Sequence, residues 1–337
     1  MKTILRLGVL ALVGTTALAL AGSALAKQTL SVKQDATSLT IKISQAQTDP
    51  QPAKITVYVP SGYTINASAT PGSKIGTTTG SIFARDLNIP LPLSGDVIVA
   101  PPSTNAPGCA TGTHLAVWLL ALQVAGQAIN LPVHVDQTTG PEAALGAYKL
   151  VICLGPADVP ANTPGRSPNG AQLLEATFAV SNIFTSPASG GIWKTITTPY
   201  AAGSPAPNPA GTVETRSFVS NGTVTLASKV ISAKKRVVRF TGKVTQAGVP
   251  VADTQVSILI NGAARFRAKT NASGAFTLNL KKKGSKAAST FQARVTAAER
   301  DITATGCASP TPGVPLGCVS ATASPFTAVS RKIKVRV

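Results

Sequence analysis

The sequence predicts an all-β protein with two β-sandwich domains, which are joined by a linker rich in Pro and Gly. Three observations support this fold class. The 337 residues include 29 Gly and 25 Pro, and short apolar runs alternate with polar residues at a period of two. No long stretch shows the helical period of about 3.6 residues. The chain is also longer than one hydrophobic core usually needs.

The first 26 residues have the pattern of a cleaved signal peptide. Lys2 and Arg6 form a basic start, residues 7–21 carry no charge, and Ala24-Leu25-Ala26 is a small-x-small cleavage site. The uncharged run is shorter than the ~20 residues that span a bilayer. We therefore expect secretion, a mature chain that begins at Lys27, and no transmembrane anchor in that mature chain.

Residues 27–200 carry strand-like runs between turn signals, which predicts the first sandwich. The clearest runs are 39–43, 54–59, 96–99, 148–153 and 174–180. The stretch 115–135 is long enough for a membrane span, but Gly126, Pro132 and several amides favour a β-hairpin that turns at Ala125-Gly126. The connection 156–168 is long and Pro-rich, which is typical of a functional or a loosely ordered loop.

Residues 201–211 are rich in Pro, Gly and Ala and predict a semi-rigid linker. The charge changes at the same place. Residues 27–211 hold 9 Lys and Arg against 8 Asp and Glu, whereas residues 212–337 hold 20 against 4. This step favours a domain boundary, so we expect a second domain over 212–337. A surface loop within one larger domain is the alternative.

The second domain shows the most regular alternation in the chain. Apolar side chains occupy every second position in the runs 238–240, 256–260, 276–280 and 291–295. A hairpin is predicted around Asn261-Gly262. A three-residue loop, Ile260-Asn261-Gly262, pairs Ile258 with Ala264 and Val256 with Phe266, which keeps apolar and charged side chains on different faces.

Three segments of this region carry a family resemblance: GKVTQAGVPVAD (242–253), VSI (256–258) and TNASGAF (270–276). They resemble the bacterial Ig-like and carboxypeptidase-regulatory-like domains. The resemblance implies a small prealbumin-type or Ig-type β-sandwich that serves as a spacer or a binding module and does not catalyse. Asn271 and Ser273 stand where acidic residues are common in these domains, which argues against calcium at this turn. No family is identified for residues 27–200.

The four cysteines are Cys109, Cys153, Cys307 and Cys318. An even number in an exported chain predicts disulfide bonds, and three pairings are formally possible. Proximity along the chain favours Cys109–Cys153 and Cys307–Cys318. The spacing matches no zinc site, so no metal is expected.

No catalytic motif is visible in the chain. The two histidines, His114 and His134, lie in the apolar hairpin region. If Val124 pairs with Gln127, His134 lies opposite Val117 and the period of two places His114 on the other face of the sheet. Acidic residues are scattered singly. We therefore expect no enzymatic activity, no catalytic residues and no cofactor. A secreted hydrolase with a basic accessory domain is the alternative.

The cations of the second domain fall on outward strand positions, which suggests a surface that binds polyanions by releasing their counterions. Anionic cell-envelope polymers are the expected partners of an exported protein. Specific nucleic-acid recognition is not expected, because no recognition helix or aromatic array is visible. The sequence thus predicts a secreted bacterial protein of the cell envelope or extracellular space. The candidate polyanion-binding residues are Arg239, Lys243, Arg265, Arg267, Lys269, Lys332, Lys334 and Arg336. A well-charged surface without a partner is the alternative.

Overall fold

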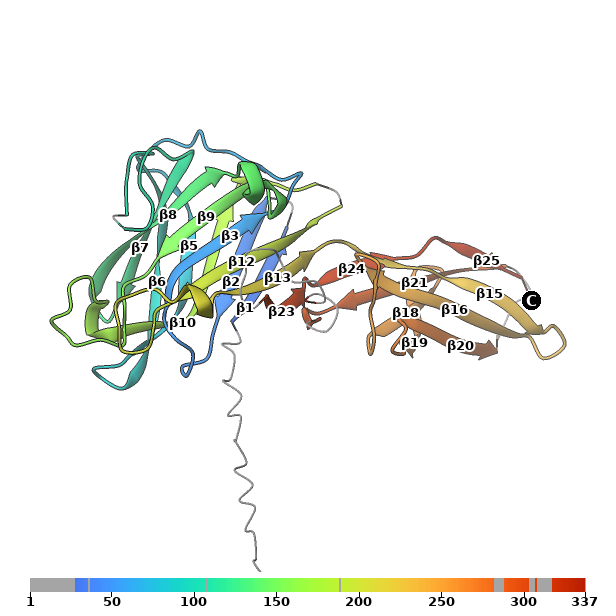
Figure 1. Cartoon of the computed structure of the whole chain (residues 1–337). Helices are drawn as coiled ribbons and strands as arrows, with labels where there is room; N and C mark the ends of the chain where they lie inside the picture. Colours follow the sequence, from blue (N-terminus) through green and yellow to red (C-terminus); the bar gives the residue numbers. More distant parts are fainter. Residues whose placement is uncertain are drawn as a thin grey trace, which may run out of the picture.

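A computed structural model describes residues 28–35, 37–106, 108–187, 189–281, 288–302, 307 and 317–336. The all-β prediction is confirmed, since nearly all regular structure in these ranges is β-strand, from β1 to β25 (Figure 1). The predicted signal peptide, residues 1–26, lies outside the described residues. Two bodies are visible in Figure 1, a large curled sheet and a smaller sandwich.

The curled sheet has thirteen strands, and every neighbouring pair is antiparallel except β13 with β23. It curls until its first strand reaches the other edge. There the Val32 amide donates to Ser217 Oγ at 2.9 Å, and Thr322 Oγ1 donates to the Leu30 carbonyl at 2.6 Å. The strands, in sheet order, are β1 (Thr29–Gln34), β2 (Ser38–Ser44), β10 (Ala171–Ser181), β5 (Lys74–Ala84), β6 (Ile89–Ala100), β7 (Ala116–Val124), β8 (Gln127–Gln137), β9 (Tyr148–Cys153), β3 (Pro52–Val59), β12 (Gly191–Pro199), β13 (Val213–Val219), β23 (Cys318–Ala323) and β22 (Arg300–Asp301).

Glycines inside β5 and β6 allow this sheet to bend. A Cβ atom on Gly80 would lie 2.0 Å from the Glu175 carbonyl oxygen, and one on Gly95 would lie 2.1 Å from that of Ala121. No other residue fits such close backbone approaches, which are typical of sharp bends in curved sheets. The bends bring the inner faces of distant strands toward each other.

The interior of the curled sheet is divided into two ends. At the aromatic end, Trp118 stacks on Phe178 with ring centroids 5.8 Å apart, and Phe184 packs edge-on against Trp118 and Trp193. Tyr63 completes the cluster against Trp193. At the other end, which we call the loop end, the interior is lined by aliphatic side chains. Large rings fill the aromatic end, whereas the loop end keeps an internal space.

The sandwich has two sheets that enclose their own core, in which Phe240 and Phe291 lie 4.6 Å apart between ring centroids. This arrangement is compatible with the Ig-like resemblance. The first sheet contains β14 (Gly222–Val224), β15 (Ala227–Ser232), β16 (Val237–Gln246), β17 (Val249–Pro250) and β20 (Ala275–Lys281). The second contains β18 (Gln255–Ile260), β19 (Ala263–Lys269), β21 (Ser289–Ala297), β24 (Phe326–Val329) and β25 (Ile333–Val335).

The register predicted for the β18–β19 hairpin is wrong. The loop has two residues, Asn261 and Gly262, both with positive φ (50° and 86°), and Ile258 pairs with Phe266 instead of Ala264. Ile260, which the prediction had placed in the loop, pairs with Ala263, and the extra residue is a bulge at Arg265 on β19. Either device leaves an apolar residue opposite Ile258, Ala264 in the prediction and Phe266 in the structure, so alternation alone does not distinguish them.

The predicted linker, residues 201–211, is a loop of the curled sheet. It connects β12 to β13, which pair with each other from Gly191–Val219 to Thr197–Val213. This is the alternative that the composition left open, because Pro and Gly suit a long hairpin connection as well as a linker. The chain enters the sandwich only after β13, returns to the curled sheet for β22 and β23, and then re-enters the sandwich.

Candidate functional site

The outer face of the second sandwich sheet is cationic. Arg267 and Arg294 both pair with Ser257, one on each side, so their side chains extend from the same face and their Cα atoms lie about 10 Å apart. Lys334 pairs with Thr290 farther along the same face. All three cations are exposed.

The predicted polyanion-binding residues divide between two opposite faces. Arg265, Arg267, Lys269, Lys332, Lys334 and Arg336 belong to strands or strand ends of the second sheet. Arg239 and Lys243 lie on β16 in the first sheet, where Lys229 pairs directly with Arg239. Lys269 is 3.0 Å from Asp253, an exposed ion pair that offsets part of its charge. Arg294 belongs to the same cationic face, and its outward position was expected from the alternating run 291–295.

The two expected disulfides are present. They join Cys109 to Cys153 and Cys307 to Cys318, with Cα atoms 6.2 and 4.9 Å apart. The first bond fastens the loop that precedes β7 to the outer side of β9. Disulfides of this kind are typical of proteins that fold in an oxidising compartment.

The placement of the two histidines on opposite faces is wrong. Their rings lie 4.5 Å apart between centroids, and both side chains are buried. His134 does pair with Val117, as expected. However, His114 lies in the loop before β7, where the period of two does not apply, and the loop folds back over His134.

The histidine pair has defined partners. Nδ1 of His114 is 3.0 Å from both carboxylate oxygens of Asp136, and His134 Nε2 is 3.1 Å from the Thr104 carbonyl. Burial, and secondly the neighbouring His114, lower the pKa of His134 below its ordinary value. Among the described residues, no group of three or more His, Cys, Asp or Glu is arranged to hold a metal ion.

The carboxylates of the curled sheet are engaged one by one with separate partners. Asp86 forms two hydrogen bonds with Arg166, at 2.5 and 2.9 Å, which lower the pKa of the Asp86 carboxyl. Glu142 is bound by Lys149 at 2.6 Å and by Tyr58 at 3.0 Å. Glu214 is fully buried beside Arg216. These contacts are those of structural ion pairs.

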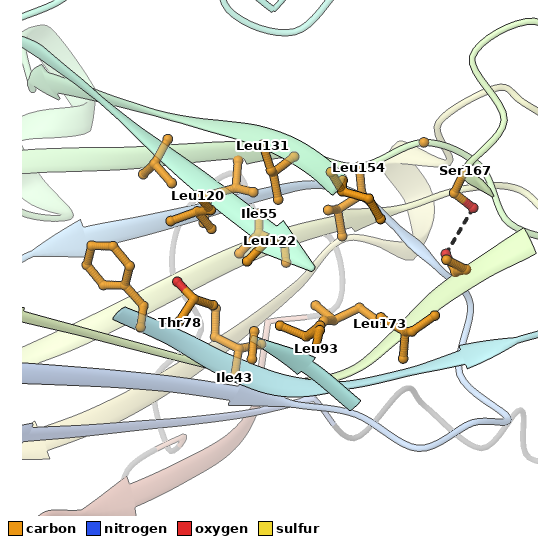
Figure 2. Close-up of a pocket in the computed structure, with 18 of the residues that line it drawn as sticks. Ile43, Ile55, Thr78, Leu93, Leu120, Leu122, Leu131, Leu154, Ser167 and Leu173 are labelled. Carbon is orange, nitrogen blue, oxygen red and sulfur yellow. Dashed lines mark hydrogen bonds between the residues drawn. The ribbon is translucent and has the colours of Figure 1, made fainter. Parts of the chain in front are cut away.

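A cavity of about 270 Å³ occupies the loop end of the curled sheet. Eight strands that are consecutive in the sheet, from β2 to β3, contribute to its wall. Most of the wall is aliphatic, as Figure 2 shows for Ile43, Ile55, Leu120 and Leu131. The segment between β9 and β10, with Ser167, closes one side. The cavity could not be predicted from the sequence, because apolar alternation is the same whether the interior is filled or hollow.

No family model and no curated protein matches this chain. Two solved structures are similar at a low level. One is a protein of Corynebacterium diphtheriae described as membrane anchored, with 11% identity, a TM-score of 0.20, and coverage of 89% of this chain and 53% of that one. The other is a 1.5-MDa bacterial ice-binding adhesin, with 12% identity, a TM-score of 0.18, and coverage of 88% and 90%.

The chain therefore spans about half the length of the Corynebacterium protein. Similarities at these TM-scores establish neither a shared fold nor a shared function. In the ranges that the structure describes, no helix has both the length and the apolar character needed to cross a membrane.

Proposed function

We propose that this chain is a secreted, non-catalytic protein of the bacterial cell envelope or extracellular space, and that its sandwich binds anionic polymers. In this proposal the sandwich is an Ig-like or carboxypeptidase-regulatory-like module. The disulfides support an oxidising compartment. The observation that carries the binding role is the Arg267–Ser257–Arg294 row on an exposed sheet face.

Strand spacing explains why this row suits a polymer better than a single small anion. Neighbouring strands lie about 4.8 Å apart, so cations on alternate strands meet successive anionic groups of an extended chain. Residues 212–337 hold 20 Lys and Arg against 4 Asp and Glu, and of these Glu214, Arg216, Arg300 and Asp301 belong to the curled sheet. Binding would release counterions from the polymer, so affinity should fall steeply with salt.

The test uses the full mature chain, because β13 leaves its partner β12 if residues 212–337 are isolated. The face variant is Arg265→Ser, Arg267→Ser and Arg294→Ser together. The matched control removes the same charge from the opposite sheet: Lys229→Ser, Arg239→Ser and Lys243→Ser. Binding of each protein to a poly(glycerol phosphate) teichoic acid is measured across a salt series.

The face variant should bind more weakly. The plot of log K against log salt should become less steep, with the magnitude of its negative slope smaller by about two, at roughly 0.7 for each lost phosphate contact. The control should keep the slope of the unchanged protein. An equal loss in both variants would show that overall charge, not this face, determines binding. No binding by the unchanged protein at low salt would refute the proposed role.

A further inference from the structure

The cavity at the loop end has the character of a ligand site. We propose that it binds the linear acyl chain of a single-chain lipid. This site is separate from the cationic face, and the inference does not depend on polymer binding. Four features of the cavity carry it: the chemistry of its wall, its origin in small residues, its size, and the segment that closes it.

The wall offers hydrocarbon contact and almost nothing else. Most of the lining side chains are Leu, Ile or Val, for example Leu93, Leu122 and Ile152. A polar or charged ligand body would lose its hydrogen bonds to water here without gaining new ones, which is costly. Phe178 is the only aromatic ring that lines it among the described residues, so no stacking platform for a sugar or a planar ring is present. An unbranched aliphatic chain meets these conditions.

Thr78 is one of the few polar residues in this wall, with Gln51, Arg166 and Ser167. It is 1% exposed, and its Oγ1 has no hydrogen-bond partner among the described residues. Figure 2 shows it among the aliphatic side chains. A buried hydroxyl without a partner is rare, because its desolvation is not compensated. Thr78 therefore departs from the satisfied polar groups of an ordinary packed core, and it lies at the wall of the cavity.

Small residues on the inner face create this space. Ala176 on β10 pairs with Gly80 on β5, and Thr78 pairs with Gly95 on β6. These neighbouring positions supply little or no side chain, while the strands opposite them carry Leu and Ile. The glycines that bend the sheet thus also prevent the interior from filling.

The size of the cavity sets an approximate chain length. At roughly 30 Å³ for each water-sized group, 270 Å³ holds about nine such groups. Methylene groups are of similar size, so the cavity fits a chain of about ten carbons. Longer chains would extend past the loop end into solvent.

The Pro-rich connection noted in the sequence closes the cavity. Gly155, Gly165 and Ser167 line it. Arg166 fixes this segment, since its Nη atoms bind Asp86 and its Nε donates to the Val159 carbonyl at 2.8 Å. Arg166, which also lines the cavity, thus has its charge paired with the Asp86 carboxylate and is not a free cation for a lipid head group. The protein would therefore recognise the acyl chain of the lipid and not its head group.

The main test is a chain-length series on the unchanged protein. Calorimetric titration uses saturated fatty acids from hexanoic to hexadecanoic acid, each below its micelle concentration. Affinity should rise about fourfold for each methylene and level off near decanoic acid. A parallel series of lysophospholipids with the same chains distinguishes the source. Chain-length dependence in either series supports the proposal, whereas a flat dependence in both, or no binding, overturns it.

Two variants with matched controls locate the site. Ala176→Leu fills the cavity and should weaken binding of decanoic acid at least tenfold, whereas Ala179→Leu, on the outer face of the same strand, should not. Thr78→Val should keep binding, because the Thr78 hydroxyl is already buried without a partner in the ligand-free protein and the wall stays apolar. Thr79→Val, at an exposed position, should have no effect. Unchanged binding in Ala176→Leu, or loss of binding in Thr78→Val, would overturn the assignment.

Discussion

The cavity has a consequence for stability that can be measured without any ligand. A Leu in place of an interior Ala usually destabilises a protein by about 1–3 kcal/mol, because a packed core must shift to accept it. Ala176 faces a space of about 270 Å³ and pairs with Gly80, which has no side chain. The added carbons of Ala176→Leu therefore enter free space.

The expected gain follows from the area buried. About 0.8 kcal/mol for each added carbon gives roughly 2.4 kcal/mol for the Leu side chain. Fixing its rotamer costs about 0.5–1 kcal/mol. We expect Ala176→Leu to raise the free energy of unfolding by about 1.5 kcal/mol.

The measurement is urea denaturation followed by tryptophan fluorescence, since Trp118 and Trp193 are both fully buried. The m-value should stay constant, so that a shift of the midpoint reports stability. Ala179→Leu, with its side chain on the outer face, should change stability by less than about 0.5 kcal/mol. If Ala176→Leu destabilises the protein while Ala179→Leu does not, the loop end is packed and the space is absent.

Three further outcomes are expected. Because the pKa of His134 lies below its ordinary 6.5, the unfolded chain takes up this proton first, so stability should be fully present above about pH 6.5 and decrease below it. His134→Gln should flatten that part of a pH series of denaturation midpoints, and an unchanged slope would assign the dependence to other groups. Gly80→Val should destabilise the protein by several kcal/mol or prevent folding, because the Cβ atom of the Val would overlap the Glu175 carbonyl oxygen. Circular dichroism during denaturation would show this. Stability equal to that of the unchanged protein would show that no bend is needed there. Replacing Cys109 and Cys153 by Ser should cost about 2–4 kcal/mol and accelerate hydrogen exchange at His114, and unaltered exchange would mean that the loop is held by other contacts.

Local patterns predicted single strands well. The run 148–153 coincides with β9, and the hairpin at Ala125-Gly126 is formed as expected. These segments combine β-branched or aliphatic residues with clear turn signals. By contrast, β5 was missed, because its sequence KIGTTTGSIFA has Thr and Gly where an apolar alternation would be visible. In β5, Gly80 allows the sheet to bend and Thr78 borders the cavity. They occupy inner positions where apolar side chains would otherwise reveal the strand.

Relations between distant segments could not be predicted from composition. The charge step near residue 211 is real, yet β13 pairs with β12 across it. Charge reports the exposed surface, whereas pairing depends on backbone hydrogen bonds. The contact between His114 and His134 was also missed, because a loop outside the regular alternation brings them together. Of the candidate site, the cationic positions followed from alternation, but their division between two faces required the sheet order.

The last strand of the curled sheet affects the order in which the chain can fold. Ser320 and Thr322 on β23 donate to the carbonyls of Gln28 and Leu30, 292 residues earlier. During synthesis the N-terminal part emerges first, yet its edge strand stays without these partners until almost the entire chain is available. Such distant contacts slow folding, because a long loop must close before they form. A half-synthesised chain would therefore present an open strand edge to other chains.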